Sequence, residues 1–517
     1  MSAKTAYIVA DKECYNMSAA ASIVSKNDSD YFAYIRSFND RLQVIIYGCQ
    51  SGKFIHQNEF TNINKFIANV SKIFDSKIKA IILQVFGFTN KEYPNNIHFC
   101  EALKAKLDAC KIPYYFMSNV NMAFTAALTT ANVSGENVTI INSRYGTAMK
   151  LEYTENGYIL GGSFPNAEAL VNSNDIKIVL VTTDKNQQRF MKMFKLKNPV
   201  LIDTGSLDNH AKALTEVKKW MSDKTYKKFH VIPMAARGYC IGFECDVKDM
   251  QHLRVDNFNV LPFIGIVGCS KTSFNQFIAY RNDDKKEIVK HQMFKLNGNA
   301  HGFNITLKID INNFPTYEVE NVIYDHIVKF PKFCDVWSVR TDLKAVIGIL
   351  ANYSFICINK NGKFEFLESW GGQWGDPIYI SFDKKKPQFG KVAEEIIAKH
   401  GKYGVQDLIL IMSEGSEAPT TIPERGYTFT KDDENPILLE FETFDGTKKS
   451  ASPEFLMAML IRQQLKAIEA EIGKKPVSIG FCIFNDLNEK QENNLQNALG
   501  KACELMKIKD FCFVPWK

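Results

Sequence analysis

The chain has 517 residues, of which 45% are apolar and 23% charged, so its composition is that of a folded protein and not of a disordered, collagen-like or coiled-coil chain. A single hydrophobic core does not extend over this length, and several domains are therefore expected. The formal net charge of +6 is small for the length and no long basic run concentrates it, which argues against nucleic acid as a partner.

The amino-terminal residues contain no signal for secretion. Met1–Ala6 precede no long apolar core, and no stretch reaches the roughly 18 apolar residues that a membrane-spanning helix needs. The 12 cysteines include no C-x-x-C pair, which favours buried reduced thiols, and the nine histidines show no zinc-ligand spacing. The sequence thus predicts a cytoplasmic protein with no membrane contact and no metal site.

Strand-like runs alternate with amphipathic helices along the chain, which predicts a mixed α/β class. The first series consists of a strand, a turn, a helix, a second strand and a second helix. Its parts are the strand 42–47, the turn Ser51-Gly52, the helix with Ile63, Ile67, Val70 and Phe74, the strand 80–86 and the helix 101–107.

The same series returns towards the carboxyl end. Its parts are the strand 437–441, the turn Asp445-Gly446, the helix with Ile461, Leu465, Ile468 and Ile472, the strand 477–483 and the helix 495–506. Gly52 and Gly446 lie 394 positions apart, and Phe88 and Phe484 lie 396 apart. A repeat of this length predicts that part of a domain is duplicated.

The second copy carries motifs of a known family. Pro453-Glu454 opens its helix and Phe484-Asn485-Asp486 follows its strand, and this segment resembles the seventy-kilodalton heat-shock chaperone family, which has a P-E-E helix before V-P-A-Y-F-N-D. Residues 137–147 resemble the family's second phosphate loop, and 200–206 resemble its third loop, V-L-V-G-G-S. Residues 261–282 resemble the start of its peptide-binding β-domain, and 348–382 resemble its opening strands. The collinear order of the motifs carries the resemblance.

The resemblance implies an actin-like, ribonuclease-H-like ATPase of two lobes, which holds nucleotide between them and controls a β-sandwich that grips extended peptides. The expected domains are a degenerate nucleotide-binding domain at 1–245 that lacks its opening strands, a partial peptide-binding β-domain at 246–335, and a truncated second copy of the first half of the ATPase domain at 336–517. The lobes are expected to be incomplete, because 159–198 is short for the family's second lobe.

The groups that hydrolysis requires are largely missing. Phosphoryl transfer to water needs carboxylates for the metal and a cation near the phosphates. The resemblance instead aligns the carboxylate positions with Asn119 and Asn142, and the position of the cation with Ile409. It places Arg144-Tyr145 where the second loop of the family begins its glycine triplet. In the second copy the first phosphate loop shrinks to 348–354. The sequence therefore predicts that hydrolysis is lost, and no catalytic residue is assigned.

Four residues keep the small or hydroxyl-bearing character that a phosphate loop needs: Gly146, Thr147, Gly205 and Ser206. The resemblance implies ATP or ADP as their ligand, whereas the missing carboxylates argue against magnesium. Ordinary turns at strand ends explain the same four residues equally well.

The preferred interpretation is a chaperone-related protein without ATP hydrolysis that acts by binding. Its expected partners are unfolded or extended peptide segments, active chaperones or co-chaperones. Two alternatives stay open, namely an ATP-binding chaperone with residual ATPase activity in protein folding and a rearranged duplicate without a selected role. Because the second copy contains the opening strands that the first is expected to lack, the two copies are also candidates for complementing one another.

One motif falls outside this interpretation. Gly265–Thr272 nearly matches the phosphate-loop pattern G-x-x-x-x-G-K-[ST], with Ser270 in place of the second glycine. The resemblance places this stretch in the peptide-binding sheet, so a phosphate-loop NTPase is the less favoured reading.

Overall fold

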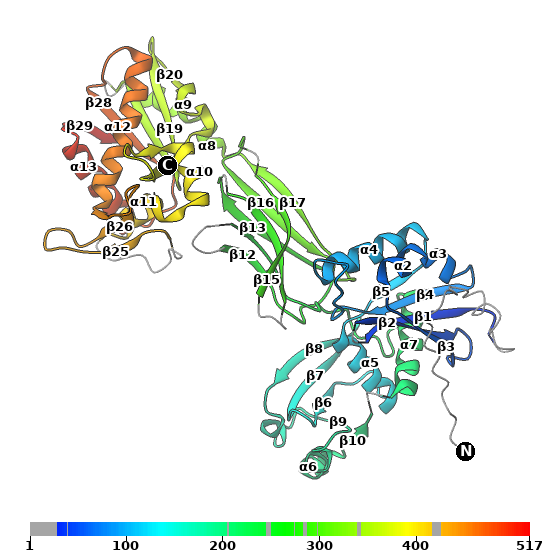
Figure 1. Ribbon diagram of the computed structural model, residues 1–517. Helices are drawn as coiled ribbons and strands as arrows, with labels where there is room; N and C mark the ends of the chain where they lie inside the picture. Colours follow the sequence, from blue (N-terminus) through cyan, green and yellow to red (C-terminus); the bar gives the residue numbers. More distant parts are fainter. Residues whose placement is uncertain are drawn as a thin grey trace.

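The computed structural model is of the mixed α/β class with several sheets. The described residues are 28–38, 40–203, 206–244, 250–272, 274–282, 287–296, 298–338, 343–415 and 425–516. Figure 1 shows four parts in series, with two lobes at the amino-terminal end, a β-domain in the middle and another lobe beyond it. We call them the first lobe (31–131), the second lobe (138–202), the β-domain (239–322) and the C-terminal lobe (345–513).

The first lobe is built on a five-stranded sheet of order β3-β2-β1-β4-β5. Its strands are β1 (Tyr31–Phe38), β2 (Arg41–Gly48), β3 (Phe54–Phe60), β4 (Ile78–Gln84) and β5 (Tyr114–Phe116). The first three form an antiparallel meander, while β4 runs parallel to β1 and β5 parallel to β4. Side chains alternate along β1, so Ala33 and Ile35 join one buried cluster and Phe32 and Tyr34 the opposite one.

Helices cover both faces of this sheet. The helices on the Ala33 face are α2 (Ile63–Ala68), α3 (Val70–Ile73) and α4 (Asn96–Ala109). The helices on the Phe32 face are α5 (Asn119–Ala131) and α7 (Leu207–Ser222). Because α7 comes after the second lobe in the chain and packs on the first, it ties the two lobes together.

The second lobe repeats the same strand order as β8-β7-β6-β9-β10. Its elements are β6 (Val138–Asn142), β7 (Thr147–Thr154), β8 (Gly157–Phe164), β9 (Ile178–Thr182), α6 (Gln187–Met193) and β10 (Val200–Ile202). β6 is antiparallel to β7 and parallel to β9, as β1 is to β2 and β4.

The C-terminal lobe shows the order a third time, as β20-β19-β18-β28-β29. The main strands and their helices are β18 (Ala345–Leu350), β19 (Tyr353–Lys360), β20 (Lys363–Phe366), α12 (Pro453–Ile472), β28 (Ser478–Ile483), α13 (Glu489–Leu505) and β29 (Asp510–Phe513). Between β20 and α12 the described residues form an insertion that contains short helices and two small sheets. Its elements are β21 (Asp376–Pro377), β22 (Ile380–Ser381), β23 (Gln388–Phe389), α10 (Gly390–Lys399), β24 (Gly404–Val405), α11 (Leu408–Glu414), β25 (Thr428–Thr430), β26 (Leu438–Glu442) and β27 (Lys448–Ala451).

The β-domain consists of two packed sheets, β12-β11-β14-β15 and β13-β16-β17, around one apolar cluster that includes Ile241, Ile278 and Ile305. Its strands are β11 (Tyr239–Phe243), β12 (Met250–Val255), β13 (Phe263–Ser270), β14 (Gln276–Asn282), β15 (Glu287–Phe294), β16 (Gly302–Ile309) and β17 (Pro315–Val322). This sheet pair begins with β11, ahead of the predicted boundary at 246. Two short helices, α8 (Asp325–Val328) and α9 (Phe330–Ser338), then pack into the C-terminal lobe.

The expectation that the first copy lacks its opening strands is wrong. β1, β2 and β3 occupy the same sheet positions as β18, β19 and β20, with the same pairing directions. The second lobe is also a full five-stranded sheet, although 159–198 is short, because β9 follows β8 without a large insertion. The sheets of the three lobes are therefore not the incomplete halves that the sequence predicted.

The predicted repeat is correct for its second half and wrong for its first. Strands 80–86 and 477–483 correspond to β4 and β28, which take the same place in their sheets. Strand 42–47 is β2 of the main sheet, whereas 437–441 lies in β26 of the small inserted sheet. The two strands share an apolar pattern and a following glycine turn, and this local likeness predicts a repeat although the strands belong to different kinds of sheet.

Two properties of the described residues bear on environment. The ten cysteines that the structure describes form no disulfide with one another. None of the helices formed by these residues combines the length and the apolar character that crossing a membrane requires.

Candidate functional site

The predicted phosphate-binding residues Gly146 and Thr147 lie where β6 turns into β7. Gly146 has a left-handed backbone (φ +67°), and its N–H donates to the carbonyl of Asn142 at 2.9 Å. Its own carbonyl accepts from the N–H of Ala167 at 2.8 Å. A side chain at 146 would meet only Phe190, at an ordinary 3.5 Å. The backbone angle of the turn thus accounts for this glycine.

The other residues of this turn are occupied with each other or with the neighbouring strand. The guanidinium of Arg144 lies 5.4 Å from the ring centroid of Tyr145, which is 68% exposed. Ser143 is fully buried, and its Oγ donates to the carbonyl of Thr182 at 2.7 Å. The Ser143 N–H donates to the hydroxyl of the same threonine at 3.0 Å.

The residues at the end of β9 were not singled out in the sequence. β9 is the parallel neighbour of β6, so Thr182 and Thr183 lie beside the Asn142–Gly146 turn at the carboxyl edge of the sheet. The signal was present, because an apolar strand that ends in Thr-Thr-Asp brings hydroxyls to that edge. The glycine-based family motif pointed to β10 instead.

The second predicted pair, Gly205 and Ser206, follows β10. Gly205 lies outside the described residues. Ser206 is the N-cap of α7, and its Oγ accepts from the N–H of Asn209 at 3.2 Å. β10 is separated from β6 by β9, so the strands that precede Ser206 and Gly146 lie about 10 Å apart. Ser206 therefore follows a strand of the same sheet, but not the neighbour of β6.

Amides occupy the place at the start of α5 where the resemblance expects a glutamate. Asn119 Oδ1 accepts from Gln84 Nε2 at 2.8 Å, and Gln84 also receives the hydroxyl of Tyr34. The next turn of the helix holds the buried Asn121, whose Nδ2 donates to the carbonyls of Val231 and Ile232 at 3.2 and 2.9 Å. These amides carry no charge, and their hydrogen bonds hold the start of α5 in place.

In the C-terminal lobe, the position predicted to lack its lysine is part of the core. Ile409 is buried in α11, but a cation is present nearby that the sequence analysis did not identify. Arg425 Nε donates to Asp407 Oδ2 at 2.8 Å, and Asp407 Oδ1 accepts from Asn352 Nδ2 at 2.8 Å. Asn352 belongs to the turn between β18 and β19, so the carboxylate of this ion pair also holds that turn.

A groove of about 1560 Å³ runs between the edge strand β3 and helix α7. Gly52 in the β2–β3 turn has a φ of +65°, and a side chain there would come within 3.0 Å of the Thr215 hydroxyl on α7. The groove contains aromatic and aliphatic surface from Phe54 and Phe229 together with several lysines.

A second cavity, of about 460 Å³, lies where the β-domain meets the C-terminal lobe. The residues after β13 supply Lys271, and the β18–β19 turn and Trp374 supply the opposite wall. Lys271 Nζ donates to the carbonyl of Trp374 at 3.0 Å and lies 5.0 Å from the Tyr353 ring centroid. Burial lowers the pKa of Lys271 to about 8, and the nearby Lys391 adds to the effect.

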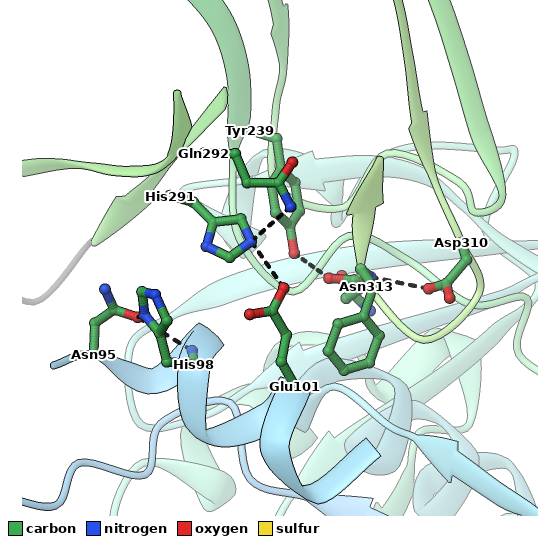
Figure 2. Close-up of polar contacts among 9 residues, drawn as sticks. Asn95, His98, Glu101, Tyr239, His291, Gln292, Asp310 and Asn313 are labelled. Atoms are coloured by element: carbon green, nitrogen blue, oxygen red, sulfur yellow. Dashed lines mark hydrogen bonds and ion pairs between the residues drawn. The ribbon is translucent and has the colours of Figure 1, made fainter. Parts of the chain in front are cut away.

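The opposite end of the β-domain is fixed to the first lobe by polar contacts. Figure 2 shows His291 of β15 directed at Glu101 of α4, with Nε2 and Oε1 2.9 Å apart. The N–H of Phe116 donates to Asn312 Oδ1 at 2.9 Å. Asp310 accepts from the N–H of Asn312, also at 2.9 Å, and burial raises the pKa of this carboxyl. These contacts hold the β-domain against the first lobe.

Among the residues that the structure describes, no group of three or more histidine, cysteine or acidic side chains is placed to hold a metal ion. A scan of the chain against models of known protein families finds no match.

Proposed function

We propose that this chain is a chaperone-related protein of the seventy-kilodalton heat-shock type that binds extended segments of other proteins and does not hydrolyse ATP. The three sheets of one strand order support an actin-like origin for its lobes, and the two-sheet β-domain in the middle of the chain supports the comparison with the peptide-binding module. The observation that carries the proposed function is the groove along β3.

The shape of this groove suits a peptide chain better than a small molecule. Its volume of about 1560 Å³ exceeds the roughly 300–1,000 Å³ of typical small-ligand pockets. One wall is β3, the terminal strand of its sheet, whose outer edge pairs with no other strand among the residues that the structure describes. An extended peptide can pair with such an edge through its own backbone.

The charges of the groove favour an acidic peptide. Lys219 is paired with Glu216, and Glu59 with Arg41. Three other lining lysines, Lys53, Lys212 and Lys228, form no ion pair with a residue that the structure describes, and the lining also contains one aspartate. An incoming peptide with acidic side chains complements this excess of positive charge.

The end of the β-domain that contacts the C-terminal lobe is already occupied by that lobe, which argues against a peptide site there. Lys271 is hydrogen-bonded to Trp374, and Phe274 is buried against Tyr379, both on the C-terminal lobe. A peptide would have to displace that lobe before it could reach this end. The groove along β3 is open without such a change.

Peptide binding is tested by fluorescence anisotropy. A labelled peptide of alternating valine and glutamate should bind the full chain, and its lysine-substituted counterpart should bind at least tenfold more weakly. Lys212→Glu with Lys228→Glu should reverse this preference, whereas Lys490→Glu, an exposed change on α13, should leave it intact. Equal binding of both peptides, or an unchanged preference in the double variant, would contradict the proposal.

The loss of hydrolysis is tested by steady-state ATP turnover with magnesium. We expect no turnover above that of the same protein heated beyond its melting temperature. Turnover that Gly146→Arg abolishes would contradict the proposal and would favour an ATPase chaperone with residual activity.

A further inference from the structure

The cavity between the β-domain and the C-terminal lobe is independent of the groove along β3. Its volume of about 460 Å³ falls in the range of small-ligand sites. Both sides contribute, because Gly268 and Lys271 come from the β-domain and Tyr353 and Trp374 from the C-terminal lobe. A ligand bound here would contact both parts of the chain at once.

Lys271 is the cation of this cavity and has unused donors. An ammonium group has three N–H donors, and the carbonyl of Trp374 accepts one of them at 3.0 Å. Lys271 forms no ion pair with any residue that the structure describes. Since a half-buried ammonium has lost part of its hydration, an anion in the cavity would supply it with a hydrogen-bond partner.

The remaining lining is neutral. His301 Nδ1 accepts from the N–H of Tyr324 at 2.9 Å, and its Nε2–H donates to the carbonyl of Gln373 at 3.0 Å. With one nitrogen as acceptor and the other as donor to backbone, this imidazole is the neutral tautomer, and burial lowers its pKa. The lining contains no acidic residue, so its formal charge is that of Lys271.

Charges just outside the lining favour a ligand with a single negative charge over a dianion. Asp376 and Glu394 both act on Lys271 through space, and Lys391 opposes them. Glu394 is almost fully buried, and the hydroxyl of Tyr353 lies 3.3 Å from each of its carboxylate oxygens. Two nearby carboxylates would repel a dianion such as phosphate more strongly than a carboxylate.

The backbone also argues against a phosphate ligand. Gly265–Ser270, the near-match to a phosphate loop, is strand β13 and pairs with β16 from Phe263 to Ser270. An extended strand does not curl its N–H groups around one anion as a phosphate loop does. The lysine of the motif is in place, but the anion-binding turn is not.

Aromatic rings form the rest of the wall. The His301 ring centroid lies 5.2 Å from that of Trp374 and 5.9 Å from those of Tyr324 and Phe355. Tyr353 faces the ammonium of Lys271 at 5.0 Å. Such walls favour a flat ring, which can stack or pack edge-on against them.

We propose that this cavity binds a small monocarboxylate that carries an aromatic ring. The carboxylate accepts from Lys271, and the ring packs among Tyr324, Phe355 and Trp374. The bound molecule joins the β-domain to the C-terminal lobe.

The test is isothermal titration of the full chain with indole-3-acetate, indole-3-acetamide, acetate and inorganic phosphate. Indole-3-acetate should bind at least tenfold more tightly than each of the other three, because it alone combines the ring and the single charge. Lys271→Met should reduce its affinity at least tenfold and should bring acid and amide to similar affinities.

Two further variants keep the test decisive. Gly268→Val should fill the cavity and abolish binding, since a side chain there would meet only Asn304 Oδ1 at 3.7 Å and a branched residue suits a strand. Lys308→Met, which removes a lysine paired with Glu318 on the outer face of the same domain, should bind as the parent does. No heat with indole-3-acetate at millimolar concentration, equal affinity for acid and amide, or undiminished binding by Lys271→Met would each overturn the proposal.

Discussion

Asp376 is a half-buried carboxyl whose charge opposes folding. It lies in the short strand β21 of the C-terminal lobe, and burial raises its pKa from 3.8 to about 6, with Lys391 acting in the opposite direction. The folded protein therefore binds a proton more readily than the unfolded chain between about pH 4 and pH 6. By linkage, this group lowers the free energy of unfolding progressively as the pH rises through that window.

Replacing Asp376 with asparagine should relieve this cost. At pH 7 the variant is expected to gain about 1–2 kcal/mol, since a shift of this size is partly offset by the lost attraction to lysines. The gain should shrink as the pH falls to 5, because the parent carboxyl then becomes protonated. Urea unfolding of both proteins at pH 5, 6 and 7 measures this. A variant that is less stable at pH 7 would show that the carboxylate makes a needed ion pair.

The pair Arg425–Asp407 should behave in the opposite manner. The two side chains are 12% and 10% exposed, so removing one charge leaves the other buried without its partner. Arg425→Met should cost about 3 kcal/mol, and adding Asp407→Asn should cost less than the sum of the single changes. Asparagine is the suitable replacement because position 407 has a φ of +62°.

Urea unfolding followed by tryptophan fluorescence measures these changes in stability. Four of the five tryptophans lie at or beyond residue 337, so the signal comes mainly from the C-terminal part of the chain. Additive effects of the two changes would mean that Arg425 and Asp407 do not stabilise each other.

At the scale of elements, α7 connects the second lobe to the first. Ser206 caps the helix through Asn209, and Ala213, Leu214 and Val217 pack on the first sheet. The resemblance implies that Ser206 contacts nucleotide, but the N-cap of α7 already explains why a hydroxyl stands at this position.

Two substitutions at Ser206 distinguish capping from nucleotide contact. Ser206→Ala should lower the free energy of unfolding by about 1 kcal/mol, whereas Ser206→Asp should keep it, because aspartate is an equally good N-cap. If Ser206 instead contacts a phosphate, aspartate would repel it. Thermal shift with ADP then decides the role, and a stabilisation by ADP that only the aspartate variant loses would contradict pure capping.

The sequence predicted most of the elements but not how they pair. The periodicity of Ile461, Leu465, Ile468 and Ile472 predicted α12, and the run at 80–86 predicted β4, because burial imposes those patterns directly. Strand order depends on contacts far apart in the chain, so 42–47 and 437–441 looked alike although one belongs to a main sheet and the other to an insertion.

The candidate sites show the same limit. The resemblance to a phosphate loop singles out Gly146, and its left-handed backbone explains why a glycine stands there. Lys271 is the lysine of the near-match to G-x-x-x-x-G-K-[ST], but that motif does not predict its contact with Trp374. Arg425 belongs to no motif and reaches Asp407 from a separate segment. Sites assembled between separate parts of a chain leave little trace in local sequence.

At the scale of the whole molecule, each lobe has its own sheet, and the C-terminal lobe also has its own buried clusters, whereas the first two lobes share the cluster that joins α5 to β6 and β9. The core of the C-terminal lobe includes α8 and α9 but no strand of the first lobe. Complementation between two partial copies is therefore not needed to complete either sheet.

A chain shortened to 1–322 is expected to fold. It keeps both amino-terminal lobes and the β-domain, and it exposes few apolar groups, Phe274 among them. Circular dichroism should show a cooperative melt, and sedimentation should show a monomer. A matched fragment that ends at 203 loses α7 and should aggregate, because the Phe32 face of the first sheet is then uncovered. Aggregation of 1–322 itself would restore the complementation hypothesis.

The insertion in the C-terminal lobe has a consequence for synthesis on the ribosome. Val346 of β18 pairs with Gly480 of β28, 134 positions later. When β18, β19 and β20 emerge, they can form their meander at once, but the far side of β18 has no strand to pair with until the insertion and α12 have been made. For that interval an apolar strand edge is open in the crowded space around the nascent chain. A protein proposed to bind extended segments of other proteins would thus expose such a segment itself while it is being synthesised.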